Sequence, residues 1–236
     1  MKVALLRVGV DSGCGGIQAP LFSDDTFEFI PIPDDRTLDR RTYGNTIGRS
    51  GRRLADFFPV RQQKRMATQP MHVDPEFQTF TYGDPTSPKR GLRNLTKGDL
   101  LVFYAGLEGF DFVSAPALYM IGYFEVEAAG LATSFSASQL GTYFVRNFHV
   151  MHANLFRQQR KDLVLVKGSE RSRLFRKAHL LSTTTQSAGK PPLKVLSHPM
   201  RKIFGNFGGR FSFQRSPTRW VESKFVDRAA AYVRSL

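Results

Sequence analysis

The chain has 236 residues, of which 41% are hydrophobic and 23% charged, so it fits one large or two small globular domains and neither a disordered tail nor a coiled coil. A single cysteine, Cys14, excludes an intramolecular disulfide framework and a cysteine-cluster zinc site, and it fits a reducing compartment. Since no apolar run reaches the roughly 20 residues of a membrane span and Arg7 interrupts the first apolar segment, we expect a soluble, cytoplasmic protein without a membrane partner.

The N-terminal region begins with an apolar, β-branched run over residues 2–10, which predicts a buried strand. A glycine-rich turn follows at residues 11–16. Two short β-prone runs within residues 21–33 then predict a hairpin. Because the glycine turn leads into a hairpin and not into a helix, neither a Rossmann fingerprint nor a P-loop is present.

The glycine-rich turn is the first candidate binding site. Gly15 and Gly16 allow the backbone to approach a ligand closely, and Arg7 and Asp11 precede them at the end of the predicted strand. Asp11 is placed to orient a hydroxyl or a base edge, or to act as a general base. The alternative is a tight turn whose glycines only supply positive φ angles.

The next segment combines a short helix with a long irregular region. Residues 47–58 predict a helix that stops at Pro59, and residues 59–98 predict a functional loop region with one strand-like run. Tyr43 and Asn45 lie upstream on either side of a glycine. In this combination the aromatic ring can stack on a base while the amide side chain hydrogen-bonds to the edge of that base. The same residues are also ordinary turn formers.

Two strong strands are predicted at residues 99–104 and 118–126, and a helix at residues 137–144. Tyr104 ends the first of these strands, where an aromatic side chain suits a pocket wall. The alternative is that both strands, with Tyr104, belong entirely to the core.

His149 and His152 lie three residues apart, a spacing that can place both on one side of a helix. They suit general acid–base chemistry, a contact to a base edge, or a structural pair. Metal binding requires at least a third ligand, and only His72, His179 and His198 remain as histidines, so no metal site is assigned.

A strand at residues 163–166 leads through Gly168 into residues 170–181, where an apolar stripe predicts an amphipathic helix. The start of a helix beside cations is a favourable place for a phosphate. The predicted phosphate contacts are Lys167, Ser169, Arg171, Ser172 and Lys177. The alternative is an ordinary capped helix. Residues 222–236 predict an amphipathic closing helix.

The net positive charge is confined to the C-terminal third. Residues 1–154 hold 16 basic and 16 acidic residues, whereas residues 155–236 hold 18 basic and 4 acidic residues and so carry the whole net charge of +14. Within residues 201–215, Arg201 and Arg210 are interleaved with phenylalanines and glycines, as in surfaces that bind single-stranded nucleic acid. A one-sided basic face favours a polyanionic partner over a merely solvated surface.

Residues 97–127, KGDLLVFYAGL…LYMIGYFEVE, resemble the strand pair of EVE and other PUA-like domains. That resemblance implies a small β-barrel that binds RNA or holds a flipped-out modified base in DNA.

The whole chain also resembles the third type of the nucleotide-modification-associated domain families. The resemblance rests on Arg7–Gly16, Pro20–Asp34, Thr42–Asn45 and Lys167–Ala178. It implies a link to prokaryotic or viral systems that modify or sense DNA bases. The residues that carry over are Asp11, Gly13, Gly15, Gly16, Tyr43, Asn45, Lys167 and Ser172.

Together these observations predict an α+β protein with a PUA-like β-barrel core at residues 97–180, an N-terminal hairpin, flanking helices and a basic part at residues 155–236. One domain over residues 1–236 is expected to bind nucleic acid, DNA rather than RNA, and to recognise or process a modified base. Asp11 and His152 are the candidate catalytic residues. Arg7, Gly15, Gly16, Tyr43, Asn45, Tyr104 and His149 are the candidate base-binding residues.

The alternative function is a nucleotide-modifying enzyme, either a transferase or a glycosidase-like hydrolase. The sequence assigns no cofactor, and other components of a base-modification system are possible partners. An adaptor protein that binds only other proteins would instead show no salt-dependent affinity for nucleic acid.

Overall fold

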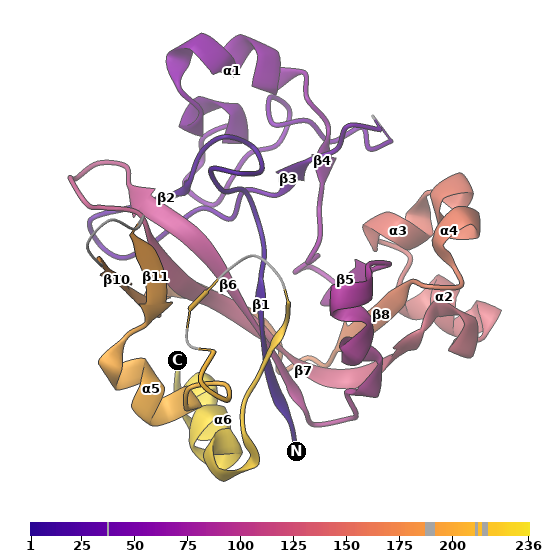
Figure 1. Cartoon of the computed structure of the whole chain (residues 1–236). Coiled ribbons are helices and arrows are strands. Elements are labelled where there is room, and N and C mark those ends of the chain that lie inside the picture. Colours follow the sequence, from indigo (N-terminus) through magenta and orange to yellow (C-terminus); the bar gives the residue numbers. More distant parts are fainter. Residues whose placement is uncertain (37, 187–191, 211, 214–216) are drawn as a thin grey trace.

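The computed structural model describes residues 1–36, 38–186, 192–210, 212–213 and 217–236, and it shows a mixed α+β protein built on one large sheet (Figure 1). The strands are β1 (Val3–Arg7), β2 (Ala19–Leu21), β3 (Ile32–Pro33), β4 (Met71–His72), β5 (Thr81–Asp84), β6 (Leu100–Gly109), β7 (Ala117–Leu131), β8 (Val164–Gly168), β9 (Arg173–Leu180), β10 (Ser182–Thr185), β11 (Leu193–Leu196) and β12 (Arg219–Trp220).

The α-helices are α1 (Val60–Ala67), α2 (Ala137–Tyr143), α3 (Phe148–Met151), α4 (Ala153–Gln159), α5 (His198–Phe204) and α6 (Val226–Ser235). Short 3₁₀ helices are η1 (Leu54–Phe57), η2 (Ser87–Asn94), η3 (Ala132–Ser134) and η4 (Ser223–Phe225). None of these helices, within the part of the chain that the structure describes, is both long and apolar enough to cross a membrane.

The main sheet has the order β12-β1-β6-β7-β8-β5, with β2 beside β6 and β9 beside β7. β1 and β2 run parallel to β6, and the other pairs are antiparallel. β7 is the longest strand, and it bonds to β6, β8 and β9 along different parts of its length. Among the described strands this arrangement forms no closed barrel, so the α+β class is confirmed and the expected PUA-like barrel is not.

Both faces of the sheet are buried. Along β6, Leu101 and Phe103 belong to the core on the side of the N-terminal segments, whereas Leu100 and Val102 belong to the core on the side of α5 and α6. Alternate side chains of a strand point to opposite faces, so a continuous apolar run is what a doubly covered strand requires. Figure 1 shows α1 at one end of the molecule, α5 and α6 at another, and α2, α3 and α4 gathered near β8.

The predicted N-terminal strand, the two central strands, the strand at 163–166 and the helices at 137–144 and 222–236 are confirmed as β1, β6, β7, β8, α2 and α6. The predicted hairpin is present in short form, with Leu21 bridged to Phe27 and Phe22 N–H donating to the Thr26 carbonyl over 2.8 Å.

The predicted helix at residues 47–58 is wrong, because only the 3₁₀ turn η1 forms there and α1 begins immediately after Pro59. A proline disfavours helix in the residue before it but is tolerated at a helix start, so Pro59 opens a helix and does not end one. The region at residues 59–98 is correspondingly less irregular than expected, since it holds α1, β4, β5 and η2.

The predicted helix at residues 170–181 is also wrong, because these residues form β9 beside β7. Phe175 and Ala178 are buried three residues apart, a spacing that resembles a helical stripe. The pairing of β9 with β7 shifts register between Met120 and Gly122, and this irregularity breaks the two-residue alternation of an ordinary strand.

Gly122→Ala is expected to lower the free energy of unfolding by about 1–3 kcal/mol, the usual range for overpacking. A Cβ at Gly122 would lie 2.5 Å from the carbonyl oxygen of Arg173 and 3.0 Å from the Cα of Leu174, so β9 would have to move. Urea unfolding measures the change. Gly141→Ala in α2 is the matched control, because a Cβ there meets nothing within 4 Å and favours helix. Equal stability of the two variants would contradict the prediction.

Candidate functional site

Three metal-ligating side chains from distant segments converge within the fold. His72 ends β4, Asp74 follows it, and His149 lies in α3. His72 Nε2 lies 3.2 Å from His149 Nε2, His149 Nε2 lies 3.5 Å from Asp74 Oδ2, and His72 Nε2 lies 3.9 Å from Asp74 Oδ2. These three residues are called the His–Asp cluster below.

Backbone hydrogen bonds hold two members of the His–Asp cluster, His149 and Asp74. The Asn147 side chain caps α3 by accepting the backbone N–H of His149 over 3.1 Å. Asp74 accepts the N–H of Gly83 over 2.9 Å. A Cβ at Gly83 would lie 3.0 Å from both Asn147 Oδ1 and His149 Cδ2, so glycine allows β5 to approach α3 this closely.

The rings of the two histidines are held by further neighbours. His149 Nδ1 lies 2.7 Å from Gln159 Oε1, an oxygen that only accepts, so Nδ1 carries a hydrogen and, in the neutral ring, Nε2 presents its lone pair to the cluster. The His72 ring stacks on Phe148 with 3.9 Å between ring centroids. The side chains of the His–Asp cluster are therefore held in defined orientations as well as close together.

Burial dominates the titration of two members. Burial raises the pKa of Asp74 to about 7, although a hydrogen bond and the charge of His149 oppose the shift. Burial, followed by the charge of His149, lowers the pKa of His72 well below its ordinary value. His72 is consequently neutral at pH 7 and has a lone pair available to a ligand or a proton donor.

The His–Asp cluster lies in the wall of a pocket of about 440 Å³, which is called the His–Asp pocket. Besides the cluster and Gln159, its charged and aromatic lining residues are Arg7, Arg36, Tyr82, Asp84 and Lys89. The Tyr82 hydroxyl donates to Asp84 over 3.0 Å. The three cationic side chains of this pocket, beside the histidines and carboxyl group of the cluster, suit a small molecule that carries an anionic group.

Two predicted base-binding residues, Arg7 and His149, line this pocket. Arg7 is paired with the candidate catalytic Asp11 at 3.2 Å. Asp11 is buried, and its carboxylate also accepts the N–H of Gly13 over 2.9 Å, so it orients Arg7 and the glycine turn and is not itself a lining residue of the pocket.

The other predicted base-binding residues lie elsewhere. Tyr43 is fully buried and donates its hydroxyl to the Pro31 carbonyl over 2.7 Å, so in this structure its ring has no face for a base. Tyr104 is buried in the core on the side of α5 and α6. Asn45 is an exposed turn residue whose side chain bonds to the Thr42 and Arg40 backbone.

Gly15 and Gly16 both have positive φ, as their turn requires, and they line a separate hollow beside Arg65. The candidate catalytic His152 lies near Phe148, with 4.9 Å between ring centroids, but outside the His–Asp cluster. Burial lowers the pKa of His152.

The predicted phosphate site has no helix at its centre, since Ser169 and Arg171 belong to the turn between β8 and β9. Lys167 donates to the backbone carbonyls of Thr79 and Gly168 over 2.9 and 2.6 Å. Ser172 is buried and accepts the Glu125 N–H over 3.1 Å. These contacts are structural, because each satisfies a backbone group of the sheet or its turns.

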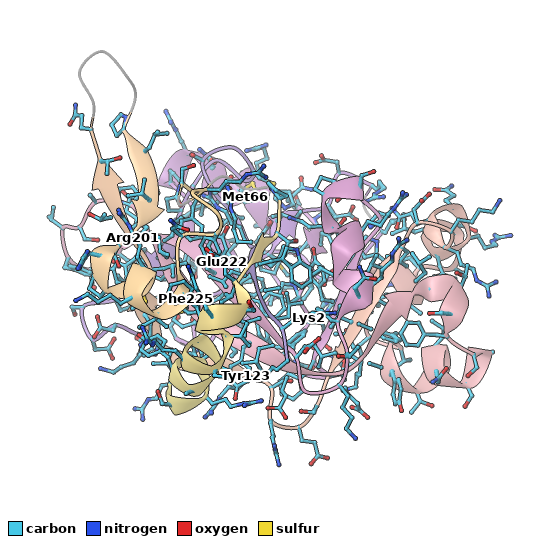
Figure 2. All side chains as sticks on the ribbon, turned by 60° about the horizontal axis from the view of Figure 1, so that its bottom comes forward. Lys2, Met66, Tyr123, Arg201, Glu222 and Phe225 are labelled. Atoms are coloured by element: carbon cyan, nitrogen blue, oxygen red, sulfur yellow. The ribbon has the colours of Figure 1, made fainter. Side chains whose placement is uncertain are left out.

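The remaining predicted phosphate contacts are dispersed. Arg171 lies 3.4 Å from Glu125, and Lys177 lies 3.9 Å from Asp25. Arg201 donates to the Leu196 carbonyl over 2.8 Å, and Figure 2 shows it beside the orange ribbon of the C-terminal part of the chain. Arg210 is exposed. Residues 211 and 214–215 of the same basic segment lie outside the described residues.

Sequence reasoning found His149 but missed its two partners. His72 and Asp74 stand two apart in the run Met-His-Val-Asp, and in an extended segment that spacing places both side chains on one face. The sequence thus indicates that His72 and Asp74 lie together, but no local pattern pairs them with His149, which is 77 positions from His72.

Comparison with known proteins gives one family match. The family model described as nucleotide modification associated domain 3 matches residues 2–235. No curated protein and no solved structure matches the chain.

Proposed function

Because the chain belongs to the nucleotide modification associated domain 3 family, which links it to nucleotide-modification systems, we propose that it recognises or processes a modified nucleotide base in the His–Asp pocket. The observation that carries this proposal is the convergence of His72, Asp74 and His149, with side chains 16%, 4% and 3% exposed, on a pocket that Arg7, Arg36 and Lys89 also line.

The size and charge of the His–Asp pocket support a nucleotide as its ligand. Its volume of about 440 Å³ falls within the roughly 300–1,000 Å³ of small-molecule sites. Arg7 and Arg36 offer guanidinium groups, which match phosphate geometry well. Tyr82 and Asp84, whose side chains bond to each other, add polar groups to the lining that suit the edge of a base.

Nucleic acid, DNA in preference to RNA, is the proposed source of that nucleotide. The excess of 14 positive charges in residues 155–236 favours a polyanion, and other components of a base-modification system remain possible partners. A base inside a duplex has to leave the stack to enter a pocket of this kind. A protein that only recognises the base and an enzyme that modifies it, as a transferase or a hydrolase, would both take the base out of the stack in this way.

The test is binding of the full chain to matched single- and double-stranded oligonucleotides, with and without modified bases, from low to physiological salt. We expect affinity to fall steeply with salt and to favour one modified base. Arg36→Ala is expected to weaken binding about tenfold and to reduce the salt slope by about one. Arg61→Ala, at an exposed position of α1, is the matched control and should change binding little.

Binding that is negligible at all salt concentrations, or that Arg36→Ala and Arg61→Ala weaken equally, would contradict the proposal. Analysis of the nucleosides after incubation separates the two forms of the function. A new nucleoside identifies an enzyme, whereas selective binding with unchanged bases identifies a recognition module.

A further inference from the structure

The His–Asp cluster has the composition and shape of a metal site. We propose that His72 Nε2, His149 Nε2 and Asp74 Oδ2 together bind one divalent first-row transition-metal ion, with a coordination position open to the His–Asp pocket. This inference concerns the site of the proposed function, but it rests on the geometry of the three ligands and not on nucleotide binding.

The distances between the three ligand atoms fit one ion. Sides of 3.2, 3.5 and 3.9 Å form a triangle whose corners are equidistant from one point. That point lies about 2.1 Å from each atom, within the roughly 2.0–2.2 Å of zinc bonds to histidine nitrogen and carboxylate oxygen. One ion can therefore reach all three atoms without a large movement of the side chains.

Hydrogen bonding within the cluster depends on few hydrogens. When the ring is neutral, His149 Nδ1–H donates to Gln159 and His149 Nε2 presents a lone pair to His72 and to Asp74. With Asp74 ionised, a single N–H of His72 can then serve only one of those neighbours, so a carboxylate oxygen and an imidazole lone pair face each other over 3.5 Å. A cation between them turns this repulsion into coordination.

The neighbours of the cluster are those of a metal site. Metal-ligating histidines usually donate their other ring N–H to a nearby acceptor, as His149 does to Gln159, and ligating carboxylates are themselves hydrogen-bonded, as Asp74 is by Gly83 N–H. The side chains of His149 and Asp74 are 3% and 4% exposed, so solvent competes little for the ion.

The donor set selects the class of ion. Two imidazoles and one carboxylate suit Zn²⁺, Fe²⁺ or Co²⁺, whereas Mg²⁺ and Ca²⁺ favour oxygen ligands alone. Three protein ligands are also the pattern of catalytic and not of structural zinc, which takes four. Since all three residues line the His–Asp pocket, the remaining position is available to water or to a ligand in that pocket.

The experiment uses the full chain, freed of metal with EDTA, without any nucleotide. Calorimetric titration with Zn²⁺ is expected to show one equivalent bound, and Co²⁺ is expected to give a visible absorption band. His72→Ala and Asp74→Asn are expected to weaken Zn²⁺ binding at least about 100-fold, and Gln159→Ala about tenfold. His179→Ala, a half-buried histidine on β9, is the matched control and should bind Zn²⁺ like the wild type.

X-ray absorption of the zinc-loaded wild type tests the proposal even if a variant does not fold. The spectrum needs no variant, because it reports the number of imidazole ligands on the zinc ion. Two imidazoles are expected. The proposal is overturned if the wild type takes up no metal, if folded His72→Ala and Asp74→Asn bind as tightly as His179→Ala, or if the spectrum shows fewer than two imidazoles. Metal uptake without oligonucleotide binding would support this inference and overturn the proposed function alone.

Discussion

Phe103→Ala is expected to lower the free energy of unfolding by about 3–5 kcal/mol, the range for removal of a large aromatic side chain from a core. Phe103 is fully buried in β6. Its ring lies 4.6 Å from that of Phe124 and 5.5 Å from that of Phe77, and 6.0 Å from Tyr82, which lines the His–Asp pocket. The substitution removes buried apolar area and leaves a cavity in the support of the pocket.

Urea or thermal unfolding, followed by circular dichroism, measures this effect. Phe112→Ala is the matched control, because its side chain is 37% exposed in the β6–β7 connection and the substitution should change stability by less than about 1 kcal/mol. A loss below about 1.5 kcal/mol for Phe103→Ala would mean that this aromatic cluster does not hold the sheet as described.

Glu28→Ala is expected to lower the free energy of unfolding by about 2–4 kcal/mol, since hydrogen bonds to a charged group contribute about 1.5–3 kcal/mol each. Glu28 is buried, with 2% of its surface exposed. Its carboxylate accepts the backbone N–H of Arg49 over 2.9 Å and that of Ser50. The residue therefore anchors the loop around Gly48 to the N-terminal hairpin.

The comparison for Glu28→Ala is Glu170→Ala, because Glu170 is exposed in the turn between β8 and β9 and its removal should change stability by less than about 0.5 kcal/mol. Hydrogen exchange at the Arg49 and Ser50 amides provides a second measurement. Faster exchange of these two amides in Glu28→Ala is expected, and unchanged exchange would show that the carboxylate does not hold the loop.

The candidate site was predicted only in part, for reasons that differ between residues. His149 was recognised because its neighbourhood holds several polar residues close in sequence. Lys167 and Ser172 are predicted phosphate contacts because the local pattern predicts the start of a helix there, whereas in the structure both side chains bond to backbone groups. Their side-chain chemistry suits phosphate, but the strand pairings that give Lys167 and Ser172 these backbone partners are not visible from local spacing.

For the basic C-terminal segment as well, the sequence predicts the chemistry of the residues but not their place in the structure. Composition located the charge excess correctly, because charge depends only on residue type. Where Arg171, Lys177 and Arg201 lie relative to the His–Asp pocket depends on the pairing of β9 with β7 and on the place of α5, and these contacts join residues far apart in the chain.

The sequence by itself determined the α+β class, the central strands, the closing helix and the membership of the family, since each of these depends on local periodicity or on a matched run of residues. Only the tertiary structure decided that His72 and Asp74 meet His149 at one pocket. The two histidines are 77 residues apart, and their meeting depends on β4, β5 and α3 packing together, which no local pattern specifies. The open sheet is a tertiary property for the same reason, because barrel closure depends on which distant strands pair.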